Sequence, residues 1–230
     1  MNYLLSAILI LFFLVLINFV LPHLAKLYWK KNNLKLAGSS GKIFLTFDDG
    51  PDIASTGEIL DTLKKFNIKA TFFVIGESAQ KNSSLIERMI KEGHAVGIHG
   101  NSHLHPWKVN PWKAMKDLAE VNKVLQNIGV QAKYIRPPYG KINFFSLIYI
   151  LLNRFVFIHW NLDPRDYEIK EAEELKAYLQ KEIANGKVVL LHDGRRPGTS
   201  PVKVTSEGLK LFLQNMKIDS DRFSSISAVY

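Results

Sequence analysis

The sequence predicts an α/β protein in which about seven strand–helix units form a barrel, preceded by an N-terminal transmembrane helix. Three observations lead to this prediction. An apolar segment opens the chain, strand-like and helix-like patterns alternate from about residue 42 onward, and polar residues recur where the strand-like segments end. With 230 residues, the chain has room for one sizeable domain after the apolar segment.

Composition narrows the class of protein. A hydrophobic share of 47% with 22% charged residues is typical of a globular domain. The chain has no cysteine, so a transition-metal site would have to be built from histidine and carboxylate. The net charge of +9 includes Lys26, Lys30, Lys31 and Lys35, which directly follow the apolar segment. A basic collar beside anionic lipid explains these lysines better than a nucleic-acid surface, and we expect no nucleic-acid partner.

The apolar segment at residues 3–21 is interrupted only by Ser6 and Asn18. About 20 helical residues rising 1.5 Å each would cross a hydrocarbon core of about 30 Å. A cleaved signal peptide is disfavoured, because no basic residue precedes the segment and no small-x-small cleavage site follows it. We therefore expect a transmembrane anchor at 1–25, a basic juxtamembrane linker at 26–41 and one catalytic domain at 42–230. Tyr28 and Trp29 could lie at the membrane interface.

Strand-like and helix-like segments alternate through the rest of the chain, a pattern typical of parallel strands with helices outside. The strand-like segments are 43–47, 70–75, 95–98, 134–136, 155–160, 188–191 and 223–228. The helical candidates are 59–66, 85–90, 115–125, 144–152, 175–183 and 209–216, the second behind a capping box formed by Ser84 and Glu87. In barrels of this kind the chemistry lies at the carboxyl ends of the strands.

The first and third strand-like segments end in residues that could bind a metal. Asp48 and Asp49 follow the first, before Gly50 and Pro51, although Asp-Gly-Pro by itself indicates a turn. The third segment is followed by His99 and, four residues later, by His103. This spacing can bring two imidazoles onto one ion, but it also arises by chance.

Polar residues also follow the fourth, fifth and sixth strand-like segments. Arg136 ends the fourth, Asp166 follows the fifth, and His192 ends the sixth. Each has an ordinary explanation, as part of a rigid turn, a polar loop or a satisfied core histidine. Their recurrence at the ends of successive strands favours a shared site.

The ordered motifs make the sequence similar to the polysaccharide deacetylase family of carbohydrate esterases, which includes peptidoglycan, chitin and chitooligosaccharide N-deacetylases. The resemblance runs from about residue 42 to the C-terminus, and its most specific part is TFDDGP at 46–51. It implies an irregular (β/α) barrel with a divalent metal ion, for which Zn²⁺ is expected. By this resemblance, Asp49, His99 and His103 bind the metal. Asp48 is the catalytic base.

The resemblance also implies roles for the remaining strand-end residues. Arg136 would hold the base in place, and Asp166 would orient His192 as the general acid. Tyr139 would offer its backbone N–H to the oxyanion, and Leu190 would line the pocket for the acetyl methyl group. Two positions depart from the usual pattern: Gly100 stands where Ser or Thr is common after the first metal histidine, and Tyr167 stands where Trp is common.

The resemblance implies removal of acetyl groups from an N-acetylated polysaccharide such as peptidoglycan or a chitin-like glycan. Two alternatives remain open at this point, an esterase acting on O-acetylated polysaccharide and a catalytically silent, membrane-tethered sugar-binding protein. A cell-wall substrate predicts a catalytic domain on the outer face of the cell membrane. The lysines after the span argue the other way, because the positive-inside rule would keep them in the cytoplasm.

Overall fold

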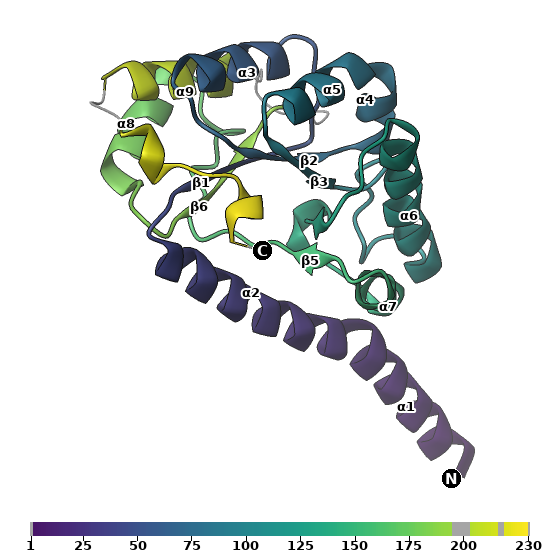
Figure 1. Cartoon of the computed structure of the whole chain (residues 1–230). Coiled ribbons are helices and arrows are strands. Elements are labelled where there is room, and N and C mark those ends of the chain that lie inside the picture. Colours follow the sequence, from purple (N-terminus) through teal and green to yellow (C-terminus); the bar gives the residue numbers. More distant parts are fainter. Residues whose placement is uncertain (1, 195–202, 216–218, 230) are drawn as a thin grey trace.

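A computed structural model describes residues 2–194, 203–215 and 219–229. Within them, six parallel strands form one curled sheet in the order β5-β4-β3-β2-β1-β6, with helices around its outside (Figure 1). The strands are β1 (Phe44–Asp48), β2 (Thr71–Val74), β3 (Ala95–Ile98), β4 (Tyr134–Ile135), β5 (Val156–Phe157) and β6 (Val188–His192). This arrangement confirms the predicted fold class.

The sheet curls far enough for its two edges to meet after β5. Leu162 forms a parallel bridge with Val189 of β6, and the Leu190 N–H donates to the Leu162 carbonyl at 2.9 Å. The closure is irregular because β4 and β5 are only two residues long. The carboxyl ends of β1, β3 and β6 nevertheless open on the same side, as parallel strands require.

The seventh predicted strand, at 223–228, is absent from the structure. Phe223 makes a single bridge to Ile43, and Ile226–Ala228 (η4) forms a 3₁₀ turn after another at Ser220–Arg222 (η3). Serines interrupt the segment, and the Ile226 N–H donates to the Thr71 side-chain hydroxyl at 3.0 Å instead of to a backbone carbonyl of a neighbouring strand. The buried Ile226 side chain belongs to a small apolar cluster with Phe44 and Phe73. The segment therefore packs against the barrel without extending the sheet.

The six predicted helices are present, and five of them begin earlier than the sequence patterns indicated. They are α3 (Thr56–Lys65), α5 (Ser83–Lys91), α6 (Pro111–Asn127), α7 (Phe144–Leu152), α8 (Ala172–Glu182) and α9 (Lys203–Asn215). The structure adds α4 (Gly76–Lys81), which was not predicted. The last predicted helix extended to residue 216, which lies outside the described residues. The predicted capping box at α5 was wrong: Ser84 lies inside the helix, and the N-cap residue Asn82 makes no side-chain capping bond.

The core lies between the sheet and the surrounding helices. Every residue of β1, β2, β3 and β6 is buried, as expected for parallel strands covered on both faces. Phe47 and Phe72 stack with ring centroids 5.0 Å apart. Each such side chain contributes about 1.5–3 kcal/mol on burial. This packing fixes the strand ends on which the polar residues sit.

One continuous helix precedes the barrel: α1 (Asn2–Val15), a π-helical turn η1 (Leu16–Val20) and α2 (Leu21–Ser40). It bends near their junction (Figure 1), where the π turn and Pro22 disturb the regular bonding. By length and composition it is the one helix among the described residues that could cross a membrane. It ends at Gly41, whose φ of +66° is the left-handed conformation common after a helix.

The second half of this helix packs on the barrel. Trp29 stacks on Phe157 with ring centroids 5.4 Å apart, and the Asn33 side-chain oxygen accepts the His159 N–H at 3.3 Å. The segment expected as a linker, 26–41, is therefore helical up to Ser40, and Ala37 is buried against the domain. Trp29 was expected at the membrane interface and instead packs against the protein core.

Candidate active site

The end of β1 brings two carboxylates to one point. Asp48 is the last residue of the strand, and Asp49 turns the chain with a φ of +74°. Both side chains are buried, and both reach the same imidazole: the Nε2 atom of His99 lies 3.7 Å from Asp48 Oδ2 and 3.2 Å from Asp49 Oδ1. The turn therefore places adjacent aspartates side by side at the mouth of the barrel.

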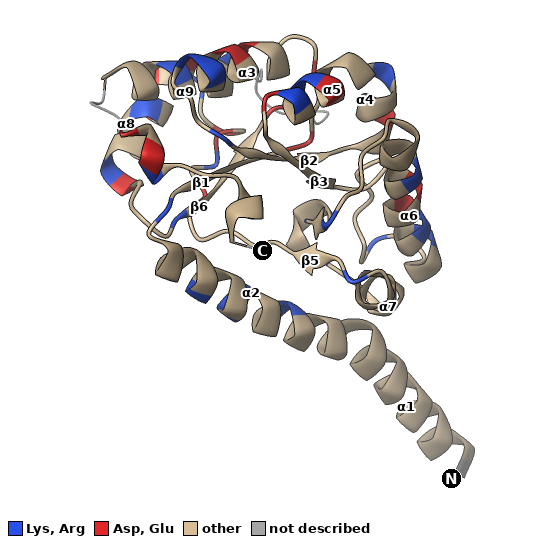
Figure 2. Cartoon of the chain, viewed as in Figure 1, with Lys and Arg blue, Asp and Glu red and all other residues tan. Residues whose placement is uncertain are grey.

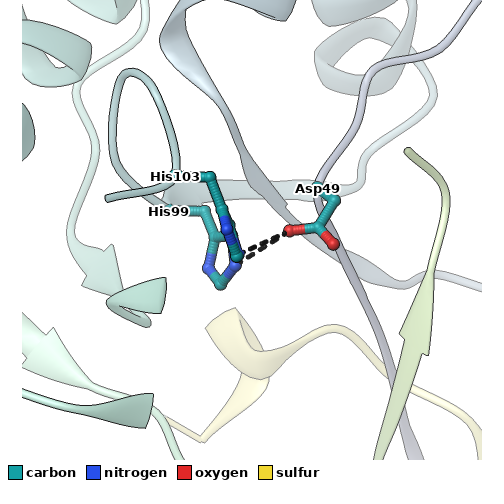
Figure 3. Close-up of side chains that lie close together, drawn as sticks. All are labelled: Asp49, His99 and His103. Carbon is teal, nitrogen blue, oxygen red and sulfur yellow. Dashed lines mark ion pairs between the residues drawn. The ribbon is translucent and has the colours of Figure 1, made fainter. Parts of the chain in front are cut away.

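Asp49, His99 and His103 converge on one point, as Figure 3 shows. His103 Nε2 lies 3.1 Å from Asp49 Oδ1, and one possible ligand atom from each residue lies within 4.8 Å of the others. His99 follows β3 directly, and His103 adopts a positive φ of 53° in the loop beyond it. One carboxylate and two imidazoles form a donor set suited to a transition metal such as zinc.

The second nitrogen of His99 defines its tautomer. Nδ1 lies 2.5 Å from the carbonyl oxygen of Arg136, which can only accept, so Nδ1 carries the proton and Nε2 is free to act as a ligand. Burial would raise the pKa of Asp49, but its close contacts with His103 and His99 hold it well below its usual range. The residues present therefore fit a divalent cation.

Asp117 of α6 braces the loop that joins the two histidines. Its Oδ2 accepts the Asn101 N–H at 3.0 Å, and its Oδ1 accepts the Ser102 N–H at 2.9 Å. At Gly100, φ is +93° and an added Cβ would lie 2.6 Å from Asp117 Oδ2. A side chain at position 100 would therefore clash with Asp117. The Asp117 carboxylate supports this loop, in which Gly100 has no hydroxyl of the kind that Ser or Thr would provide.

Arg136 forms a buried salt bridge with Asp48. Its fully buried guanidinium donates from Nη1 to Asp48 Oδ1 at 2.8 Å and to the Thr46 hydroxyl at 2.9 Å. The guanidinium also lies over the Phe73 ring, 4.3 Å from its centroid. Burial lowers the pKa of Arg136, and the charge of Asp48 offsets this shift only in part. The pair fixes one carboxylate oxygen and leaves the other directed toward His99.

Across the pocket, Asp166 binds His192 at two atoms. Its Oδ1 lies 2.7 Å from His192 Nδ1, and its Oδ2 accepts the His192 backbone N–H at 2.8 Å. The Thr205 hydroxyl of α9 donates to the same Oδ2 at 2.8 Å. Burial alone would lower the pKa of His192, but the charge and hydrogen bond of Asp166, with Asp49 and Asp48 nearby, raise it to about 9.

A pocket of about 240 Å³ joins these groups. Its lining includes Asp48, His99, His103, Tyr139, Lys141, Trp160, Tyr167, Leu190 and His192. Tyr139 has a φ of +59° and lies at the mouth, with its ring 4.8 Å from that of His103. The Tyr167 ring stands perpendicular to His192 at 5.3 Å. Every site residue expected from the sequence thus lies in this pocket or contacts a residue that does.

Sequence reasoning missed several supporting residues. Asp117 could have been noticed as a charged residue on the apolar stripe of its helix, beside Ala114 and Val121. Thr205 has no comparable signal, because its contact with Asp166 spans 39 positions. Asp193 is fully buried beside Gly50, and its Oδ2 accepts the Thr56 hydroxyl at 2.7 Å. Burial raises the pKa of Asp193 to about 7.

Comparison with known proteins identifies the family. A family model described as polysaccharide deacetylase matches residues 35–147. A peptidoglycan-N-acetylglucosamine deacetylase of Bacillus cereus is 32% identical over 84% of this chain and 69% of its own length. The chain belongs to the polysaccharide deacetylase family. This result confirms the resemblance inferred from the motifs.

Other members of the polysaccharide deacetylase family have the same architecture or a similar sequence. A chitooligosaccharide deacetylase of Rhizobium leguminosarum is 37% identical over 67% of this chain and 69% of its own length. The crystal structure of the Bc1960 peptidoglycan N-acetylglucosamine deacetylase superposes with a TM-score of 0.74 at 32% identity, covering 83% of this chain and 88% of that one. This chain and Bc1960 therefore share the fold that surrounds the pocket.

Proposed function

We propose that this polysaccharide deacetylase is a metal-dependent hydrolase that removes acetyl groups from N-acetylated glycans and releases acetate. One observation carries the proposal: the Asp49, His99 and His103 cluster lies beside the Arg136-bound Asp48, while the Asp166-bound His192 lines the same pocket. Amide hydrolysis needs an activated water, a site for the oxyanion and a proton for the leaving amine, and these groups can supply all three.

Asp49, His99 and His103 would hold the ion, and one carboxylate with two imidazoles is a ligand set that suits Zn²⁺. When bound, a divalent cation lowers the pKa of a coordinated water and polarises the acetyl carbonyl. Asp48 would take the proton from the attacking water. Its salt bridge with Arg136 fixes the position of this carboxylate beside the metal cluster.

His192 would donate the proton to the departing sugar nitrogen. Its raised pKa, about 9, keeps the imidazole charged at neutral pH, although a nearby divalent cation would act in the opposite direction. Asp166 fixes Nδ1 and so directs Nε2 as the donating atom. The backbone N–H at Tyr139 would complete the oxyanion site.

The substrate proposal follows from the pocket and the relatives. Leu190, a buried residue of the pocket lining, would contact the acetyl methyl group, and Tyr167 would form an aromatic wall beside the sugar. Relatives named for peptidoglycan N-acetylglucosamine and for chitooligosaccharides support an N-acetylglucosamine-type sugar.

Acetate release from purified full-length protein tests the proposal. Panels of N-acetylated and O-acetylated oligosaccharides should yield acetate from the N-acetyl set, and the His192→Ala variant should serve as the matched inactive protein. Acetate from the O-acetyl panel alone would replace the proposal with the esterase. Glycan binding without acetate release, in metal-loaded protein, would replace it with the sugar-binding protein.

We also propose that residues 1–25 anchor the protein, that 26–41 form a basic juxtamembrane segment and that the catalytic domain, 42–230, lies on the outer face of the membrane. The exposed, apolar α1 supports the anchor, and a cell-wall glycan supports the outer face. Reporter fusions after Tyr230 should be active outside the cytoplasm. Activity only inside it would overturn this orientation.

A further inference from the structure

Helix α7 exposes an apolar face that the proposed reaction does not use. Its nine residues include no charged side chain. Phe145, Ile148 and Leu152 recur at the spacing of one helical face, and they are 37%, 38% and 78% exposed, with Leu151 beside them at 54%. Such a contiguous face is unusual on a protein surrounded by water.

Two tryptophans extend the face of α7. The Trp112 ring meets Phe145 edge to face, with centroids 5.3 Å apart, and is 50% exposed. Trp107 is 40% exposed, and its indole N–H donates to the Ile142 carbonyl at 3.0 Å. Together with Phe145, Ile148, Leu151 and Leu152, these tryptophans form what we call the α7 face. Tryptophan combines an apolar ring with a polar N–H and is enriched at membrane interfaces.

The α7 face lies beside the end of the apolar N-terminal segment. The Trp107 ring stands edge-on to Phe19 of η1, with centroids 5.9 Å apart. Helix α7 contacts both η1 and α2, and Figure 1 shows it next to the α1–α2 junction. If residues 1–25 span the membrane, residues 16–20 lie toward the domain end of the span, and the α7 face is at the same depth.

Positive charges border the α7 face where lipid headgroups would lie. Lys141 Nζ stands 4.4 Å from the Trp107 ring centroid. Lys26 of α2 lies near enough to Lys30 and Lys141 for their charges to act on it. Figure 2 shows the lysines along α2, which adjoins α7. Lysines above apolar and aromatic side chains match an anionic bilayer surface.

A row of rings links this boundary to the pocket. The His103 ring lies 4.8 Å from Tyr139, Tyr139 lies 4.7 Å from His105, and His105 lies 6.4 Å from Trp107. Lys141 both lines the pocket and contacts Trp107. The mouth of the pocket is therefore next to the α7 face.

We propose that the α7 face is a second membrane-contact surface, seated in the interface of the bilayer that the N-terminal helix crosses. This proposal rests on the proposed anchor. Its occupant is lipid bearing anionic headgroups. The two attachments fix the orientation of the barrel, so the pocket opens close to the membrane surface and meets glycan presented there.

Because the chain contains no cysteine, single introduced cysteines can each take one spin label. Full-length protein is reconstituted into phosphatidylcholine and phosphatidylglycerol vesicles with a label at Phe12→Cys, Ile148→Cys or Ile90→Cys. Ile90 is the matched control, because it is an isoleucine that is 46% exposed and belongs to α5, a helix that lies away from α7 (Figure 1). Acetate release from soluble chitooligosaccharide checks that each variant is folded. Leu152→Cys replaces Ile148→Cys if the latter is inactive.

Collision of the label with oxygen, which concentrates in lipid, is compared with collision with a water-soluble nickel chelate. We expect the ratio of oxygen to nickel collisions to be severalfold higher at positions 12 and 148 than at 90. A lipid-exposed label at 12 with a water-exposed label at 148 overturns the α7 contact and leaves the anchor intact. Water exposure at 12 removes the anchor and this proposal together. Spin–spin broadening at 148 assigns the face to a second copy of the chain and also overturns the proposal.

Discussion

Asp166 forms hydrogen bonds with both the ring and the backbone of His192. Its Oδ1 lies 2.7 Å from the ring Nδ1, and its Oδ2 accepts the backbone N–H at 2.8 Å. The same carboxylate therefore sets the charge of the imidazole and its direction. Thr205 donates to Oδ2 as well, so the carboxylate itself cannot rotate freely. The arrangement joins the ends of two chain segments in one hydrogen-bonded unit.

Asp166→Asn should move the alkaline limb of the kcat/KM profile to lower pH and lower the peak rate, because the imidazole loses the charge that raises its pKa. His192→Ala should lose about 10²–10⁴-fold in rate with metal content retained. Thr205→Val, which leaves the Asp166 to Nδ1 contact in place, should shift the limb less. An unmoved limb in Asp166→Asn, with near-parental turnover in His192→Ala, would make the pair structural.

If Asp49, His99 and His103 bind the metal, variants of the ligands should lose the ion, whereas a variant of Asp48 should keep it. His99→Ala and His103→Ala should each lose both the ion and activity, because two ligands are too few to hold a divalent cation firmly. Asp48→Asn should lose turnover but keep the ion. Elemental analysis of all three purified variants measures the metal content. Chelation of the parent protein should abolish acetate release, and Zn²⁺ should restore it. Full metal content in both histidine variants would refute the assignment.

Asp117→Asn should weaken metal binding by about 10–100-fold, as loss of an outer partner commonly does. The amide would present an NH₂ group to one of the two N–H donors that the carboxylate now accepts. Glu120→Gln, an exposed acidic residue on the same helix, is the matched control and should bind the metal normally. Competition with a fluorescent zinc chelator measures the affinities. Equal affinities in the two variants would show that Asp117 does not position the histidine loop.

Arg136→Met should destabilise the protein by about 3–5 kcal/mol, because it leaves Asp48 as a buried charge without its partner. The double variant Asp48→Asn with Arg136→Met should recover part of this loss, since it removes the charge as well. Urea unfolding of metal-free protein provides the free energies for the full cycle. Strict additivity of the two single changes would argue against a coupled pair.

Asp193 should make the metal-free protein less stable as the pH rises from about 4 to about 7. Its pKa is raised from 3.8 to about 7 by burial, so in this window the native state keeps a proton that the unfolded chain has released. Asp193→Asn retains an acceptor for Thr56 and should gain stability relative to the parent at pH 7 but not near pH 4. Urea unfolding at both pH values measures the difference, and a pH-independent difference would contradict the prediction.

Much of the site could be predicted because short motifs lie at strand ends. Local sequence identified Asp48 and Asp49 at the turn that ends β1, His99 after β3 and His192 at the end of β6. Parallel strands bring their carboxyl ends to one edge, so finding the strands was enough to predict that these residues meet. The error at 223–228 has the opposite cause: an apolar and serine-rich segment fits a strand locally, but only pairing with a free sheet edge would make it one.

The sequence by itself determined the fold class, the anchor candidate and the residues at the mouth of the barrel, because periodicity and motif order are local properties of the chain. Tertiary structure alone decided which residues support them. Asp117 braces a loop that begins 16 positions away, Thr205 reaches Asp166 across 39 positions, and Trp107 meets Phe19 at the end of the apolar helix. Such contacts depend on how helices pack around the sheet, and side-chain packing between distant elements leaves no periodic trace in the sequence.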